Sequence, residues 1–178
     1  MALEIEAKIR VADLKPIADR LISLKAVLKG TVREEDIYFD NGAVELIKKD
    51  CGLRLRKRLS DTQPPQIILT YKGPRQESAF KSRPEYQVRL DDAETMVTIF
   101  QSLDFRESLK IQKTRQIWRL DDCEICLDEV TLLGLFVEVE GASDIAVHTV
   151  LAKLGLNPAD HVSEGYARMM AARLNLGK

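Results

Sequence analysis

The feature that most constrains this chain is a strand pattern with one apolar face and one charged face. It appears at once, in residues 3–10, where apolar Leu3, Ile5, Ala7 and Ile9 alternate with Glu4, Glu6, Lys8 and Arg10. Successive side chains of a strand point to opposite faces, so the charged residues share one face. Two carboxylates roughly 7 Å apart on that face repel by about 2 kcal/mol at an effective dielectric constant of about 20. Water, neighbouring bases or a bound cation must offset this repulsion.

Strand-like runs of this kind continue along the chain. They are predicted at residues 4–10, 35–40, 52–59, 66–73, 83–90, 113–120, 123–130 and 135–141. Roughly eight strands joined by short turns predict an antiparallel sheet large enough to curl or to close.

Four segments have apolar residues at helical spacing instead. They are residues 13–28, 92–103, 144–154 and 158–174. Asp13 is the expected N-cap of the first helix, and the breaker run GLNP separates the last two. Strands and helices together predict an α+β fold.

Size and charge limit the kind of protein. At 178 residues the chain is expected to form a single domain, residues 1–178, that folds without disulfides. The 27 basic residues nearly cancel the 28 acidic ones, so no overall field favours nucleic acid or an anionic membrane as a partner. There is neither a signal-like start nor a run near the ~18 apolar residues of a membrane span, so the expected location is cytoplasmic. Monomer and homodimer both stay open.

The three cysteines are too few and too odd in number for a disulfide framework. Cys123 and Cys126 form a CxxC in a strand-like run, where positions three apart face opposite ways, and no second CxxC completes a zinc site. We therefore expect ordinary reduced cysteines.

The charged face has two interpretations. It is either the solvated side of a sheet packed on helices, or it curls inward. Same-face pairs favour the second interpretation: Glu4 with Glu6, Glu138 with Glu140 near Asp128, Arg54 with Arg56, and Lys113 with Arg115. Grouped carboxylates suit Mg²⁺ or Mn²⁺, and grouped bases suit the oxygens of a polyphosphate. Because burying unpaired ions costs several kcal/mol each, such an interior is expected to stay hydrated.

Six motifs in order along nearly the whole chain resemble the CYTH superfamily, or triphosphate tunnel metalloenzymes. They are ExExK at Glu4–Lys8, LRLR at Leu53–Arg56, LTYKGP at Leu69–Pro74, SRPEYQV around Glu85, KTR at Lys113–Arg115, and LDEVTLLGLFVEVEG at Leu127–Gly141. This resemblance implies an eight-stranded antiparallel β-barrel that forms a triphosphate tunnel, with α-helices packed on the outside.

The resemblance also implies the site residues. Divalent metal would be held by Glu4, Glu6, Asp128, Glu138 and Glu140. Phosphate oxygens would be held by Lys8, Arg54, Arg56, Lys72, Arg83, Lys113 and Arg115. Lys8 is a candidate for proton transfer if the clustered cations lower its pKa, and Glu85 would orient the bases or help a second metal. Asp40 lies where the family often has an acidic residue.

The LTYKGP and DIYFD motifs are most similar to those of class IV adenylyl cyclases. This resemblance implies conversion of ATP to cyclic AMP and pyrophosphate. Inorganic or thiamine triphosphatase activity stays open, as does a non-catalytic module that binds polyphosphate or a nucleotide. The chain departs from the family near its end, where Ser163 and Tyr166 are separated and no lysine precedes them. Tyr166 is therefore as readily interpreted as a packing residue.

Overall fold

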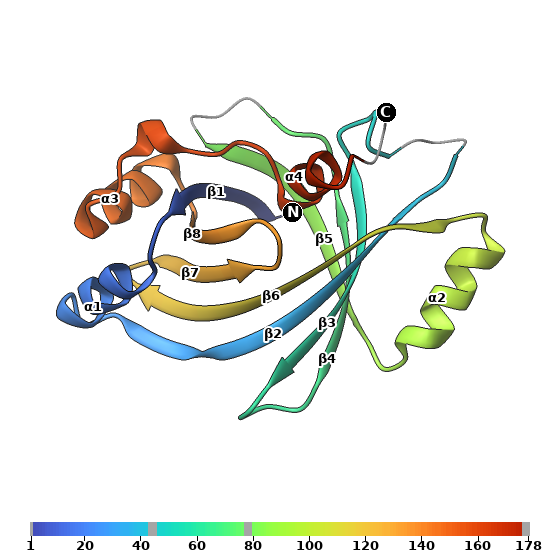
Figure 1. Cartoon of the computed structure of the whole chain (residues 1–178), viewed down its shortest axis with the longest axis horizontal. Helices are drawn as coiled ribbons and strands as arrows, with labels where there is room; N and C mark the ends of the chain where they lie inside the picture. The colour runs from blue at the N-terminus through green and yellow to red at the C-terminus, as the bar shows by residue number, and fades with distance from the viewer. Residues whose placement is uncertain (1, 43–45, 77–79, 176–178) are drawn as a thin grey trace.

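The strands close into an antiparallel barrel in the order β1-β5-β4-β3-β2-β6-β7-β8, as the sequence predicts (Figure 1). The structure is a computed structural model that describes residues 2–42, 46–76 and 80–175, without the side chains of residues 2–4 and 81. The strands are β1 (Ala2–Val11), β2 (Val27–Asp40), β3 (Gly52–Ser60), β4 (Gln66–Lys72), β5 (Lys81–Leu90), β6 (Arg106–Leu120), β7 (Cys123–Val130) and β8 (Gly134–Gly141).

The helices lie outside or at the end of this barrel. They are α1 (Lys15–Ser23), α2 (Ala93–Ser102), α3 (Asp144–Leu154) and α4 (Tyr166–Arg173), with a 3₁₀ turn at Pro158–Asp160. Figure 1 shows α1 and α3 together on one side, α2 on the opposite side, and α4 above the strands beside the N-terminus. Within the described ranges, the helices fall short of the length and apolarity that crossing a bilayer requires.

The prediction for residues 13–28 was wrong in its extent. Helix α1 ends at Ser23, and Lys25 adopts a positive φ of 58° before β2 begins at Val27. The N-cap is Leu14, although the Asp13 carboxylate accepts a hydrogen bond from the Lys15 amide at 2.9 Å. Strands β2 and β6 are both longer than predicted, and they pair along most of their length.

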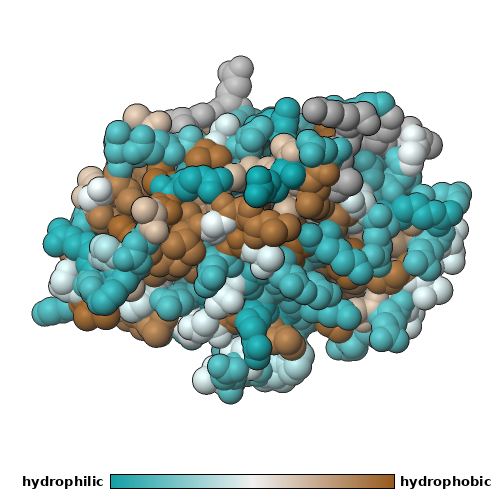
Figure 2. Space-filling model, in the orientation of Figure 1, coloured by the Kyte–Doolittle hydropathy of each residue, from teal (hydrophilic) through white to brown (hydrophobic). Residues whose placement is uncertain are grey.

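The apolar faces of the strands pack outward against the helices. One core cluster joins Leu21 of α1 and Leu151 of α3 to Ile125 and Val139 on the barrel wall. A second joins Phe100 of α2 to Phe39, with ring centroids 4.9 Å apart. Figure 2 shows hydrophobic surface gathered on the side where α1 and α3 lie. Since the helices take the apolar faces, the charged faces are left to line the barrel.

The two cysteines of β7 lie on different faces of the strand, one toward the apolar core and one toward the barrel interior. Cys123 lies in the core beneath α1 and α3, whereas Cys126 belongs to the opposite, inward face of β7. All three cysteines are free thiols, as the sequence predicts.

Candidate functional site

The register of the barrel sets acids opposite bases. Five such pairs face each other across neighbouring strands: Lys8 and Glu138, Arg115 and Asp128, Lys113 and Glu34, Arg56 and Asp36, and Lys72 and Glu85. Directly opposed residues of an antiparallel pair have side chains on the same face and within reach of each other. The ladder therefore brings together charges that lie far apart in the sequence.

One half of the network is centred on Lys8 and Arg115. The Lys8 ammonium lies 3.3 Å from a Glu6 oxygen and 3.2 Å from a Glu138 oxygen. Glu138 also accepts a hydrogen bond from Arg115. Arg115 donates two parallel hydrogen bonds to the Asp128 carboxylate, at 2.6 and 2.5 Å. This is the bidentate geometry that a guanidinium offers to a carboxylate or a phosphate. Three strands, β1, β8 and β6, thus meet β7 at one cluster.

The other half is centred on Arg56. Its Nε and Nη2 donate to the two carboxylate oxygens of Asp36 at 2.6 and 2.8 Å. Its Nη1 lies 3.0 Å from Glu34, and Arg58 also contacts Glu34 at 2.7 Å. Lys113 lies 3.3 Å from Glu34 and 3.5 Å from Asp128, so it joins the two halves into one network around the barrel.

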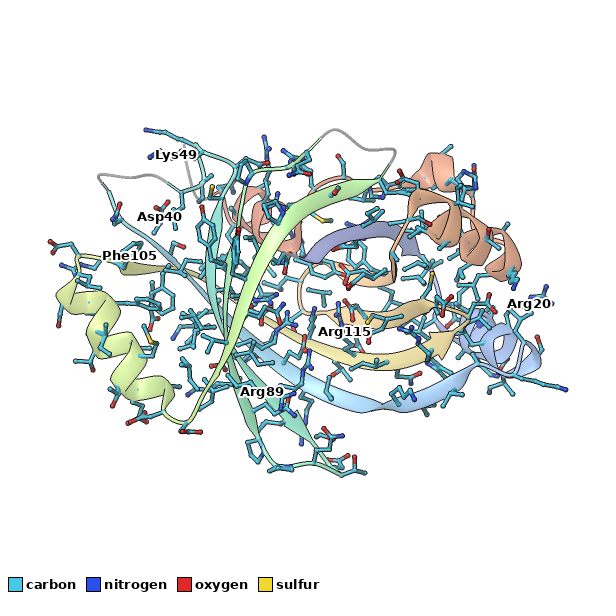
Figure 3. The ribbon with its side chains drawn as sticks, turned by 180° about the vertical axis from the view of Figure 1, so that it is seen from behind. Arg20, Asp40, Lys49, Arg89, Phe105 and Arg115 are labelled. Carbon is cyan, nitrogen blue, oxygen red and sulfur yellow. The ribbon has the colours of Figure 1, made fainter. Side chains whose placement is uncertain are left out.

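These charged groups are shielded from solvent. Lys8 is 1% exposed, Asp128 0% and Glu34 2%. The inward interpretation of the charged face is therefore confirmed, and the solvated-sheet alternative is wrong. Mutual pairing offsets part of the cost of burying these ions. Figure 3 shows Arg115 among the interior side chains, whereas Arg20 and Lys49 lie at the periphery.

Three of the predicted residues lie on β4 and β5, across the barrel from β6 and β7. Lys72 and Glu85 bond directly to each other between β4 and β5. Arg83 turns toward Asp50, with its Nη2 3.4 Å from the Asp50 carboxylate. Arg54, by contrast, stays with the main network and donates to Thr70 Oγ1 at 3.1 Å.

The predicted metal ligands are close in register but not gathered at one point. Glu6 lies opposite Glu140 across β1 and β8, two residues along each strand from the pair of Lys8 and Glu138. The side chain of Glu4 lies outside the described residues. Within the part of the chain that the structure describes, no three acidic, histidine or cysteine side chains converge closely enough to hold a metal ion. In kind the donors do fit a hard divalent cation, because carboxylate oxygens are the ligands that Mg²⁺ and Mn²⁺ favour.

The predicted lowering of the Lys8 pKa, on which its proton-transfer role depended, is wrong. Burial acts to lower the pKa of Lys8, but the carboxylates of Glu6 and Glu138 outweigh it and raise this pKa. The pKa of Lys113, by contrast, is lowered, because burial and the adjacent Arg115 both disfavour its charged form. The raised pKa favours the charged ammonium form of Lys8.

Sequence reasoning missed Glu34 and Asp36, the two acids that hold the basic groups of β3. Glu34 and Asp36 are two apart, but Glu35 between them is also charged, so the alternation that marks one polar face is not visible there. Asp40, by contrast, lies at the end of β2, away from Arg115 in Figure 3, and accepts a bond from the Leu46 amide. It orders a turn.

We predict an acid-sensitive part of the stability that belongs to Asp36. Burial acts to raise its pKa, but Arg54 and Arg56 outweigh burial and lower the pKa to about 2. A pKa that is lower in the folded state gives stability that is present above about pH 4 and is lost as the pH falls through 2. The shift corresponds to about 2 kcal/mol in the free energy of unfolding.

Urea unfolding at pH 7, 4, 3 and 2 measures this loss. The Asp36→Asn variant is expected to show a shallower decline below pH 4 than the wild type. The exposed Asp61→Asn variant is the control and should follow the wild-type curve. Equal slopes for Asp36→Asn and the wild type would contradict the assignment.

Comparison with known proteins now identifies the family. The family model described as the CYTH domain matches residues 2–166. The chain belongs to the CYTH domain family. It is 32% identical over 177 residues, 99% of this chain and 91% of the relative, to a provisionally named adenylate cyclase of Methanocaldococcus jannaschii.

Solved structures of other proteins agree with the fold. The PH1819 protein of Pyrococcus horikoshii superposes with a TM-score of 0.85 at 26% identity, covering 96% of this chain and 99% of that chain. A provisionally named adenylyl cyclase of Hippeastrum, described as having a dominant triphosphatase activity, has a TM-score of 0.68 at 16% identity, with 98% and 96% of the two chains covered. At that identity the second likeness shows the fold alone.

Proposed function

We propose that the protein binds a triphosphate inside the barrel and acts on it with Mg²⁺ or Mn²⁺. The supporting observation is the interior network, in which basic groups from three strands face inward and are already paired with oxygen acceptors. These groups are Lys8, Arg54, Arg56, Lys113 and Arg115. Phosphate oxygens resemble carboxylate oxygens as acceptors, so a triphosphate would compete for the same N–H donors.

Each part of the network has a task in this proposal. The basic groups bind and orient the triphosphate and neutralise the charge that develops during in-line displacement. Lys72 and Arg83 would extend this set onto β4 and β5, with Glu85 orienting Lys72. Glu6, Glu138 and Glu140, with Glu4 and Asp128, would hold the divalent cation. When bound, that cation supplies Lewis-acid stabilisation of the phosphate oxygens.

Two reactions fit this arrangement. In a cyclase, the 3′-oxygen of ATP attacks the α-phosphorus, the bond from that phosphorus to the bridging oxygen breaks, and pyrophosphate leaves. The name of the 32% identical archaeal relative favours this reaction. In a triphosphatase, a water oxygen attacks the terminal phosphorus and a diphosphate leaves. The triphosphatase activity described for the Hippeastrum neighbour supports that reaction as the second candidate.

A substrate panel separates the candidates. Purified protein is incubated with ATP, thiamine triphosphate or tripolyphosphate, each with Mg²⁺, Mn²⁺ or a chelator, and the products are resolved by chromatography. Cyclic AMP with equimolar pyrophosphate would support the cyclase. Orthophosphate released from tripolyphosphate, without cyclic AMP from ATP, would reject it and support the triphosphatase.

The panel also addresses a non-catalytic binding module. Such a module would be stabilised by its ligand, by about 2.7 kcal/mol at a hundred times the dissociation constant. Thermal melting with each triphosphate therefore accompanies the assays. Stabilisation without turnover of any substrate would overturn the enzyme proposal, and neither stabilisation nor turnover would overturn triphosphate binding altogether.

A further inference from the structure

The C-terminal segment enters the charged network through Tyr166. His161 pairs with Ile9 in an isolated β-bridge, and its Nδ1 accepts a hydrogen bond from the Lys8 amide at 3.1 Å. The Val162 amide donates to the Lys8 carbonyl at 2.8 Å. These contacts fasten the segment to β1 immediately before α4 begins at Tyr166. The side chain that follows is therefore held at the end of the barrel, where Figure 1 places α4.

Tyr166 contacts three charged groups of the proposed triphosphate site. Its hydroxyl donates to Asp128 Oδ2 at 2.9 Å. The Lys8 ammonium lies 4.2 Å from the centre of its ring, and the Lys113 ammonium lies 5.1 Å from the same centre. The residue is only 8% exposed. One side chain thus links two lysines that come from different strands of the network.

The chemistry of the ring suits this place. The face of an aromatic ring carries partial negative charge and attracts an ammonium ion, most strongly where water is excluded. Two ammonium groups repel each other, so the attraction of both to one aromatic ring favours keeping them close to that ring without neutralising either. A purely apolar side chain would fill the same volume without this attraction.

The hydroxyl acts on a different partner. Asp128 is already held by both nitrogens of the Arg115 fork, and the Tyr166 hydroxyl adds a third bond to that carboxylate. Three directional bonds define the plane in which the carboxylate lies. The ring and the hydroxyl of Tyr166 therefore have separable effects, one on the bases and one on an acid.

We propose that Tyr166 is a positioning residue of the triphosphate site: its ring holds Lys8 and Lys113 toward a common point, and its hydroxyl orients Asp128. This inference rests on the proposed function and replaces the interpretation of Tyr166 as a packing residue. Among the charged groups of the site the ring contacts the two lysines, so the effect of the ring appears in binding without metal. The hydroxyl contact is with a proposed metal ligand, so its effect appears in the dependence on divalent cation.

The test compares Tyr166→Leu, Tyr166→Phe and the control Met170→Leu, which alters a 2% exposed apolar residue of the same helix. Tripolyphosphate binding is measured by calorimetry in the presence of a chelator. Tyr166→Leu is expected to weaken binding about tenfold through the lost ring attraction. Tyr166→Phe and Met170→Leu should stay within about twofold of the wild type, because the ring of the first and the site of the second are intact.

The hydroxyl is tested by adding Mg²⁺. Tyr166→Phe is expected to need several-fold more Mg²⁺ than Met170→Leu for half of the additional thermal stabilisation of the tripolyphosphate complex. Tyr166→Leu binding as tightly as Met170→Leu would overturn the ring role, and an unchanged Mg²⁺ requirement in Tyr166→Phe would overturn the hydroxyl role. Should Tyr166→Leu not fold, the Mg²⁺ requirement of Tyr166→Phe still tests the hydroxyl role. A wild type that binds no tripolyphosphate refutes the proposed function instead.

Discussion

The Arg56→Ala variant is expected to lose about 3 to 5 kcal/mol of its free energy of unfolding. Arg56 is 5% exposed and makes the bidentate contact to Asp36 as well as a contact to Glu34. Its removal leaves two buried carboxylates with fewer partners in a medium that solvates them poorly. Arg54 remains 3.8 Å from Asp36, and Lys113 remains 3.3 Å from Glu34, so neither acid loses every base.

Urea unfolding of four variants measures the effect: Arg56→Ala, Asp36→Ala, the double variant and Lys57→Ala. Lys57→Ala is the matched control, because Lys57 is the next residue of β3 and lies exposed on the outer face; we expect a change within about 0.5 kcal/mol. The double variant Asp36→Ala, Arg56→Ala should cost less than the sum of its single changes, since it removes one buried acid together with its base. A loss in Arg56→Ala no larger than that in Lys57→Ala would refute the assignment.

The pattern that predicted this interior has a physical limit, which β2 illustrates. Alternation is visible only where one face is apolar and the other polar. In the middle of β2, Arg33 and Glu35 face outward while Glu34 and Asp36 face inward, so both faces carry charge and the period of two disappears. The strand was therefore predicted only from residue 35, and its two interior acids were not recognised.

The pairing of particular acids with particular bases inside the barrel could not be predicted from the sequence, for a different reason. The same-face pairs predicted which side chains share a face, but not which acid meets which base across strands. Lys8 meets Glu138 because β1 and β8 close the barrel in one register, and a shift of a single residue would turn every such side chain to the other face. That register is fixed by the packing of the whole apolar shell.

Tyr166 shows the corresponding limit for helices. The apolar spacing of residues 158–174 correctly predicted a helix with a packed face, although α4 occupies only Tyr166–Arg173. Met170 and Tyr166 do belong to an apolar cluster with Phe136. Spacing alone does not distinguish packing on the outside of a barrel from packing at its end, where one edge of the same residue meets charged groups.

The Lys8→Met variant is expected to lose about 10²- to 10³-fold in kcat/KM for the triphosphate that the substrate panel identifies, the usual cost of removing one preorganised charge-stabilising group. Lys8 is a buried cation that touches several components of the site. Its ammonium contacts Glu6, Glu138, the Glu164 carbonyl and the Tyr166 ring. Methionine keeps most of the length and the apolar stem, and the backbone bonds of residue 8 to His161 and Val162 do not involve the side chain. The loss therefore reports on the charge.

Steady-state kinetics and tripolyphosphate calorimetry are measured together, with circular dichroism to establish that each variant is folded. Lys15→Met is the control, because Lys15 is an exposed lysine on α1 whose side-chain partner is Asp19; it should match the wild type in both measurements. If binding weakens in Lys8→Met while kcat is retained, Lys8 binds the ground state and the transition state equally. If kcat falls with little change in binding, the ammonium acts on charge that develops during displacement. Activity and affinity both within about twofold of the Lys15→Met values would remove Lys8 from the site, since a cation buried at the centre of the network would then contribute nothing measurable to the transition state.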